Sequence, residues 1–301
     1  MSISRVSDAQ TFAFLTERAG RLEVRIRDLQ EQIASGRRLH RPEQDPLGSG
    51  QVSTLSASIS ALGQYEESSR FGTDMLSAQD EALDEAQQLL VRAEEIATQQ
   101  ASDLLGPAER AAAREEVHGL LQGVTVIANS ELAGRRLFAG LALGAAAPFA
   151  DPDSAGYSAA TAYGGSTHEV EIKIGADPID RVRISTRGDQ VFGDALTALE
   201  ALETALASGG SVPATLAGLA QGRETLAGER ASVGARQTEL LARTSQVGGL
   251  TLNAETALSR VRDADQVTVV SELVNVQTAL QALLAAGSRV VQTNLASLLR
   301  I

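Results

Sequence analysis

The chain has 301 residues, no cysteine, three tyrosines, six phenylalanines, no tryptophan and a formal net charge of −12 at pH 7. The lack of cysteine excludes disulfides, thiolate metal sites and cysteine nucleophiles. The acidic balance argues against nucleic-acid binding, which requires a basic face, and the scarcity of aromatic side chains favours thin helical packing over a thick globular core.

Residues 1–36 predict an amphipathic helix that ends at Gly36. Its apolar residues recur at alternating steps of three and four, which places them on one stripe, as in the seam of a coiled coil. These positions are Phe12, Leu15, Ala19, Leu22, Ile26, Leu29 and Ile33. We interpret the segment as an N-terminal core helix whose stripe is buried against other helices.

The following residues, 37–50, predict a structured loop or hinge, because Pro42 and Pro46 cannot both lie inside a helix. We assign Asp45 to the same hinge. The arginine pair Arg37–Arg38 is expected to form ion pairs with nearby carboxylates or with a neighbouring subunit.

Residues 37–140 are interpreted as the first part of a middle helical domain, in which Pro107 separates two helices. Residues 141–195 predict a small β-containing outer insert, because apolar residues alternate with polar ones on both sides of a turn at Ala176–Pro178. That alternation predicts a hairpin between about Val170 and Ser185.

Residues 196–265 are interpreted as the second part of the middle domain. An apolar residue recurs every seven positions from Leu219 to Val261, but most intermediate seam positions are polar. Such a seam is weak alone and predicts partners on more than one side. The pair Gly248–Gly249 is expected to interrupt or bend this helix.

The last segment, residues 266–301, predicts a C-terminal core helix with a second heptad stripe. Its positions are Val269, Leu273, Val276, Leu280, Leu283, Gly287 and Val290. Seams at both ends of one chain predict that the ends pack together and complete their core with neighbouring subunits. The chain is therefore interpreted as an assembly subunit.

The distribution of charge agrees with this interpretation. Residues 1–50 and residues 266–301 each carry a net +1, so the residues between them carry −14, which makes the total −12. Nearly neutral, apolar ends suit burial, and an acidic middle suits solvent. No cleaved secretory signal is recognisable, and no run is expected to span a membrane, which needs about 20 apolar residues.

No set of residues predicts catalysis, a cofactor or a metal. The three histidines, His40, His118 and His168, have no partner at metal-ligand spacing. The sequence also lacks a phosphate-binding loop and a nucleophile elbow.

Several motifs resemble the flagellin superfamily, and among its members the FlgL family of hook–filament junction proteins. SGRRLHRPEQDP at residues 35–46 is similar to the superfamily signature near the N-terminus, with Arg41 and Gln44 as departures. ANSELAGRRLFAG at residues 128–140 is similar to the junction-protein motif, with Arg136 where tyrosine is typical. Further similar stretches are RGDQVFGD (187–194), ERASVGARQ (229–237), RDADQ (262–266) and the C-terminal ASLLRI.

The resemblance implies a mainly α, elongated flagellin-like helical bundle, with the coiled-coil ends packed together and the β insert at the far tip. It implies a structural subunit of the bacterial flagellum, exported without a cleaved signal through the type III apparatus and placed outside the cell. Its implied partners are other copies in a ring, the first hook-associated protein below, flagellin above, and an export chaperone on the C-terminal helix.

Three other interpretations remain open at this point. A short filament flagellin has the same helical architecture. A cytosolic coiled-coil adaptor is compatible with the heptads alone, because heptads also occur in ordinary bundles. An enzyme with its site in the β insert lacks any convergent acid, base or nucleophile.

Overall fold

The computed structural model describes residues 2–43, 45–101, 106–142 and 146–298. Most of the described chain is α-helical: α1 (Ser2–Ser35), α2 (Pro46–Gln100), α3 (Pro107–Ala128), α4 (Gly188–Ser208), α5 (Leu216–Arg262) and α6 (Gln266–Leu298). Short antiparallel hairpins join β1 (Glu131–Leu132) to β2 (Arg135–Arg136) and β3 (Glu171–Lys173) to β4 (Arg181–Arg183). The prediction of a mainly α fold with a small β insert is confirmed.

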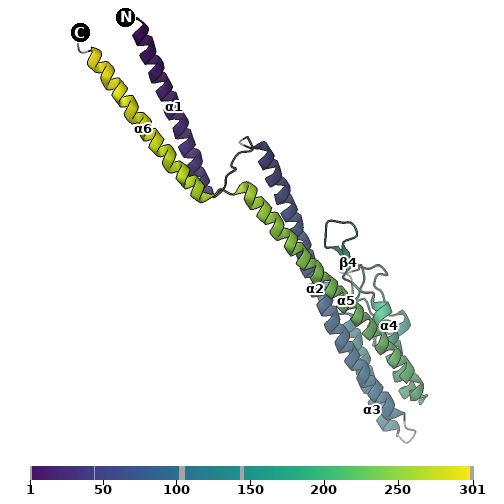
Figure 1. Cartoon of the computed structure of the whole chain (residues 1–301). Coiled ribbons are helices and arrows are strands. Elements are labelled where there is room, and N and C mark those ends of the chain that lie inside the picture. The colour runs from purple at the N-terminus through teal and green to yellow at the C-terminus, as the bar shows by residue number, and fades with distance from the viewer. Residues whose placement is uncertain (1, 44, 102–105, 143–145, 299–301) are drawn as a thin grey trace. The chain divides into compact units, whose positions relative to one another are not determined.

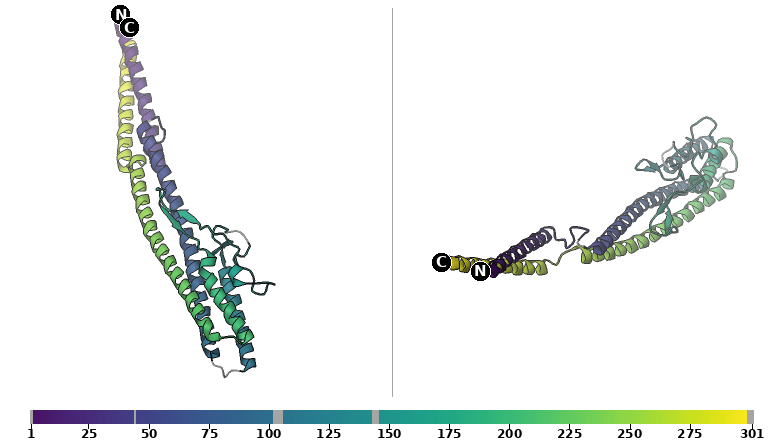
Figure 2. Two further views of the ribbon diagram at one scale, coloured as in Figure 1. Left: turned by 90° about the vertical axis from the view of Figure 1, so that its right-hand side faces the viewer. Right: turned by 90° about the horizontal axis from the view of Figure 1, so that it is seen from above.

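Two compact units make up the chain, one of Met1–Ser60 and Thr251–Ile301, the other of Ala61–Leu250. In the first unit, α1 and α6 lie side by side and run in opposite directions (Figure 1, Figure 2). The expected packing of the two terminal helices against each other is therefore confirmed. Unit 1 and unit 2 are the names used below.

Unit 2 is a helical bundle in which α2 and α5 run antiparallel and α3 packs against α4. Polar side chains on successive turns of α5 reach progressively earlier turns of α2. The donor–acceptor distances are 3.1 Å for Arg223 to Glu94, 2.8 Å for Arg230 to Asp80 and 3.4 Å for Gln237 to Ser77.

These contacts explain the mixed heptads of α5. The apolar positions Leu219, Leu226, Val233 and Leu240 are all fully buried. The intermediate polar positions lie at the edge of the same face, where their long side chains bond to α2 and their aliphatic stems cover the core. A seam that looks weak in the sequence is therefore complete once α2 lies beside it.

The connection from α3 to α4 holds both hairpins and an aromatic cluster. Ala133 and Gly134 form the tight turn between β1 and β2 with positive φ angles of 51° and 75°. Phe138 is fully buried and meets Phe192 of α4 edge to face, with ring centroids 4.8 Å apart. The β3–β4 pairing of Ile172 with Val182 confirms the predicted hairpin.

The placement of the insert at a far tip is wrong. The insert packs along the side of unit 2, where its strands lie against the middle of α2 and α5 (Figure 1). A β-carbon added at Gly72 of α2 would lie only 2.5 Å from Cδ1 of Ile172. The reason is apolar burial, because Ile172, Val182 and Ile184 have a helical surface to cover.

Two local expectations also need correction. The hinge is shorter than residues 37–50, because α2 begins at Pro46, whose fixed φ and missing N–H suit the first helical position. The pair Gly248–Gly249 lies inside α5 and does not interrupt it. Glycine lowers helix stability by about 1 kcal/mol per residue relative to alanine, which the packing of α5 outweighs.

Gly140 is the glycine for which this fold has the strictest requirement. Its φ is +60°, and an added β-carbon would lie 2.4 Å from the carbonyl oxygen of Ser166 and 2.6 Å from that of His168. We expect Gly140→Ala to lower the free energy of unfolding of unit 2 by roughly 3 kcal/mol or more, because backbone must move. Denaturant unfolding followed by circular dichroism measures this.

Gly134→Ala is the matched control, because Gly134 also has a positive φ, of +75°, but nothing lies within 4 Å of its added β-carbon. It should cost only the left-handed backbone strain, about 1 kcal/mol. Equal losses for the two variants would contradict the close approach at Gly140.

Candidate assembly interface

The predicted seam positions face the α1–α6 contact wherever their side chains are described. Leu29 is fully buried and Val269 is 8% exposed. Most residues between the seam positions are exposed. The other described seam positions are partly buried, namely Leu15, Ala19, Leu22, Ile26, Ile33, Leu273, Val276, Leu280, Leu283 and Gly287. Phe12 and Val290 lie outside the part whose side chains the structure describes.

The seam is not closed by these two helices. A groove of about 330 Å³ lies along it, lined by Leu15, Thr16, Ala19, Leu283, Leu284, Gly287 and Ser288. Gly287 keeps the groove open, because the nearest atom to its added β-carbon is Cδ1 of Leu15 at 3.7 Å. Two packed helices touch along a single line. An apolar stripe wider than that line is only partly covered, so side chains from another helix can pack on the rest of it.

A second apolar stripe on α6 was not predicted. Val267, Val270, Val274 and Leu284 are 77%, 46%, 54% and 59% exposed. Val267, Val270 and Val274 are spaced by three and four, and Leu284 follows ten residues later on the same heptad pattern. This signal is present in the sequence, and the seam assignment overlooked it.

The expectation that no segment is long and apolar enough for a membrane span also needs correction. The Gln266–Arg289 segment is long and apolar enough to pass that test by length and composition alone, and almost none of it is buried. The polar residues within it are too few to lower its hydropathy. One such helix is weak grounds for a membrane span, and Glu272 in its middle is bonded to α1.

That bond crosses the contact between α1 and α6. Arg25 donates two hydrogen bonds to Oε1 of Glu272, at 3.0 Å and 2.6 Å. Both side chains are more than two-fifths exposed, so solvent screens the pair and its contribution to stability is about 0–1 kcal/mol. The pair can form in only one alignment of α1 with α6, so it favours that alignment over others in which the two apolar stripes have slid past each other.

In unit 1, backbone hydrogen bonds join the loop that follows α1 to the loop that precedes α6. Gly36, with φ of +68°, ends α1, and its carbonyl accepts a 2.9 Å bond from the N–H of Ala264. The N–H of Arg38 donates to the carbonyl of Arg262 at 2.8 Å. The Arg262 guanidinium holds the pKa of Asp263 below its usual value through a hydrogen bond.

The hinge residues have distinct places. Asp45 caps α2, accepting a 2.9 Å bond from the N–H of Gly48, and lies 3.7 Å from Arg38, an ion pair of the expected kind. Pro46 starts that helix, and Pro42 is exposed in the loop. The first turn of α6 has an equivalent cap, Asp265, whose pKa is lowered by hydrogen bonds from Thr268.

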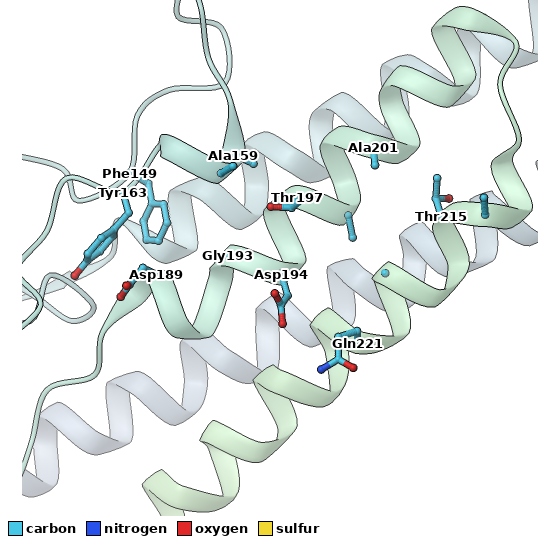
Figure 3. A pocket seen from close by; sticks show the side chains of 14 residues that line it. Phe149, Ala159, Tyr163, Asp189, Gly193, Asp194, Thr197, Ala201, Thr215 and Gln221 are labelled. Carbon is cyan, nitrogen blue, oxygen red and sulfur yellow. The ribbon is translucent and has the colours of Figure 1, made fainter.

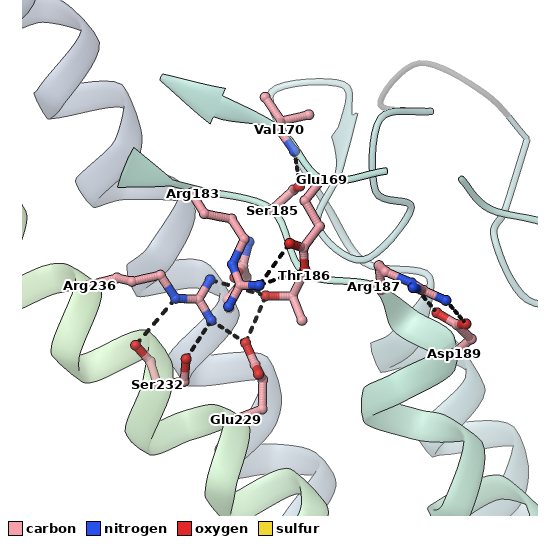
Figure 4. A network of polar contacts seen from close by, with 11 residues as sticks. Glu169, Val170, Arg183, Ser185, Thr186, Arg187, Asp189, Glu229, Ser232 and Arg236 are labelled. Atoms are coloured by element: carbon pink, nitrogen blue, oxygen red, sulfur yellow. Dashed lines mark hydrogen bonds and ion pairs between the residues drawn. The ribbon is translucent and has the colours of Figure 1, made fainter. Parts of the chain in front are cut away.

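A buried polar network ties the insert to the helices of unit 2, and the sequence motifs meet there (Figure 4). Gln79 of α2 donates a 2.7 Å bond to the carbonyl of Ile184 and accepts from Thr186 at 3.2 Å. The same Thr186 hydroxyl lies 3.0 Å from Glu229, so its one hydrogen is shared between Gln79 and Glu229, and Glu229 is ion-paired with Arg236. The resemblance motifs around residues 187 and 229–237 are therefore structural joints.

No group of three or more His, Cys, Asp or Glu residues suited to a metal ion occurs among the residues that the structure describes. His40 lies 3.1 Å from the hydroxyl of Ser35, and His168 is exposed.

His118 instead bridges two acidic residues. Its Nδ1 lies 3.3 Å from Glu203 of α4, and its Nε2 lies 2.9 Å from Asp153 of the insert. Burial lowers the pKa of His118, but hydrogen bonds to both carboxylates outweigh burial, and the pKa is raised above its ordinary value. When protonated, the imidazole can donate to both carboxylates and so joins the loop around Asp153 to α3 and α4.

Comparisons with known proteins agree with this architecture. The model of the bacterial flagellin N-terminal helical region matches residues 15–142. Flagellar hook-associated protein 3 of Salmonella typhimurium is 26% identical over 284 residues, covering 84% of this chain and 86% of that protein. The flagellar filament 30.7 kDa core protein of Treponema maltophilum is 25% identical, covering 85% of each chain.

A solved structure shares the fold. The putative flagellar hook-associated protein from Vibrio parahaemolyticus superposes with a TM-score of 0.64 over 73% of this chain and 100% of that chain, at 17% identity.

The His118 clamp predicts a pH dependence. Because its folded-state pKa is raised, its stabilisation is complete below the unfolded value of about 6.5 and is lost as the pH rises through the folded value. An NMR titration of His118 should therefore give a midpoint above about 6.5, and Asp153→Asn should lower it. A wild-type midpoint at or below the unfolded value would contradict the clamp.

Proposed function

This chain belongs to the flagellar hook-associated protein 3 (FlgL) family of the flagellin superfamily, and from this membership we propose that it is a structural subunit at the junction between flagellar hook and filament. The observation that carries the proposal is the open apolar seam between α1 and α6. A subunit with such a seam at its chain ends completes its core only in the company of other copies.

The physical mechanism is folding coupled to assembly. The α1–α6 pair leaves most seam side chains half exposed, so each helix has modest support in the monomer. Burial of one Leu, Ile or Val is worth about 1.5–3 kcal/mol, so several such burials by neighbouring copies offset the entropy of ordering the pair. The exposed α6 stripe at Val267, Val270 and Val274 supplies a second surface for the same purpose.

The finer partners follow from the position of a junction subunit. The copies form a ring, with the first hook-associated protein below and flagellin above. An export chaperone covers the apolar α6 in the cytosol before the chain leaves for the outside of the cell. The same half-exposed surface serves both partners in turn, first the chaperone and then the neighbouring copies.

A filament protein is the second candidate, and the match to the Treponema maltophilum filament core protein favours it. A filament subunit repeats along the whole length, whereas a junction subunit is confined to one place. The two differ in copy number and position and share the terminal-helix mechanism.

Leu280→Asp tests the seam. Leu280 is partly buried between α1 and α6, so a carboxylate there is costly to bury in the assembly. We expect incorporation into flagella to fall at least about tenfold, since 1.4 kcal/mol already changes an equilibrium tenfold, while unit 2 stays folded by circular dichroism.

Thr278→Asp places the same charge on the same helix at an exposed position away from the seam. It should incorporate much better than Leu280→Asp. Normal incorporation of Leu280→Asp, or equal loss in both variants, would contradict the seam assignment.

Immunogold electron microscopy of intact flagella tests the function itself. Label confined to the boundary between hook and filament supports the junction role. Label along the filament supports a filament flagellin, and absence of label from flagella supports a cytosolic adaptor.

A further inference from the structure

A single apolar side chain projects from unit 2 at the tip of the β3–β4 hairpin. Ile179 is 87% exposed, more than any other large apolar side chain among the described residues. The tip that carries it is held in place. The N–H of Ile174 donates to the carbonyl of Asp180 at 2.9 Å, and the Asp180 carboxylate lies 3.6 Å from Arg243 of α5. Ile179 is thus a fixed projection from the surface.

Two positive charges stand beside this projection. Lys173 and Arg181 are directly opposite each other in the β3–β4 register, and both are exposed. Like charges in that position destabilise a hairpin. Their neighbours relieve this only partly, because Arg181 lies 3.8 Å from Glu171 and Lys173 lies 5.6 Å from the ring centre of Tyr65. A carboxylate from outside would remove the repulsion.

An apolar groove of about 540 Å³ lies elsewhere on unit 2, between the 3-10 helix η1 (Ala159–Thr161), α4 and the start of α5 (Figure 3). Its floor contains the buried Phe149 and Ala198, and its walls include small residues such as Ala201. At its rim is the exposed carboxylate of Asp194, which accepts a 3.1 Å bond from Thr225. The groove is therefore apolar inside with an exposed carboxylate at its edge, and it matches the apolar Ile179 with Lys173 and Arg181 of the hairpin, whose tip also carries the exposed Asp177.

The hairpin of the same molecule does not fill this groove. It is anchored at Arg243 of α5, whereas the groove reaches along α5 only as far as Gln221. At 1.5 Å per helical residue, these positions are about 33 Å apart. An apolar side chain with positive charges beside it must therefore reach the groove from another molecule. The hairpin of a second copy of the chain has these features.

We propose that Ile179 of one copy inserts into the α4–α5 groove of a neighbouring copy, with Lys173 and Arg181 facing Asp194. The proposal rests on the junction function, which brings copies side by side. A projection and a groove at separate places on one subunit make a head-to-tail contact, which repeats from copy to copy and closes a ring or continues a helix.

The lack of cysteine in the chain makes a direct test clean. The double variant Ile179→Cys with Ala201→Cys replaces two exposed residues, one on the projection and one in the groove. It is expressed in cells that lack the native protein, and flagella are isolated and mildly oxidised. Inserted projections bring the two thiols close enough for disulfides between copies, so a ladder of covalent multimers is expected on a non-reducing gel.

Matched controls establish whether the crosslink requires both positions. Each single-cysteine variant should stay monomeric on the same gel. Leu241→Cys with Ala201→Cys uses another exposed apolar position, 63% exposed on α5, and should give no ladder. Ile179→Asp should weaken association of copies at least about tenfold, since burial of an isoleucine is worth 1.5–3 kcal/mol, and Ile179→Leu should restore it.

The outcomes separate the inference from the function on which it rests. A ladder only in the Ile179–Ala201 variant supports the contact. Label at the junction without a ladder overturns the contact and leaves the function standing. Dimers from Ile179→Cys alone, or a ladder with Leu241→Cys, also overturn it. Absence of the native protein from flagella overturns both.

Discussion

An apolar stripe wider than two helices can cover is the constraint on which the rest of this structure depends. In α1 and α6, Leu29 and Val269 are buried, but the other described seam positions are only partly covered, and Leu283 borders an open groove. A water-exposed surface of this kind is unfavourable in a lone molecule. In the function proposed here this surplus drives association, so that the same residues set both the fold of unit 1 and its contacts with neighbouring copies.

Unit 2 differs from unit 1, because its core is buried within one copy. Its core runs through α2, α3, α4 and α5, and the polar seam positions of α5 end in ion pairs with α2, as Arg230 does with Asp80. The insert is joined to the helices by a polar network at Gln79, Thr186 and Glu229. Buried polar groups whose hydrogen bonds are satisfied in only one geometry restrict the unit to a single arrangement.

The two kinds of surface divide the work of assembly. The terminal helices supply apolar burial, which is strong but tolerant of sliding, and Arg25 with Glu272 limits that sliding. A fixed projection with a matching groove, such as Ile179 and the region around Asp194, supplies direction and spacing between copies. Association that combines the two forms a defined array instead of a disordered aggregate.

The sequence by itself determined the helices, the heptad stripes, the hairpin and the resemblance to flagellin-superfamily motifs, because periodicity and motifs are local and leave a direct trace in residue order. Only the tertiary structure decided where the insert lies, that Pro46 begins α2, and that Arg230 and Thr186 are joints between distant segments. These depend on which surfaces meet in space. A one-dimensional pattern shows that a face is apolar, but it does not show how much of that face remains uncovered once the helices pack.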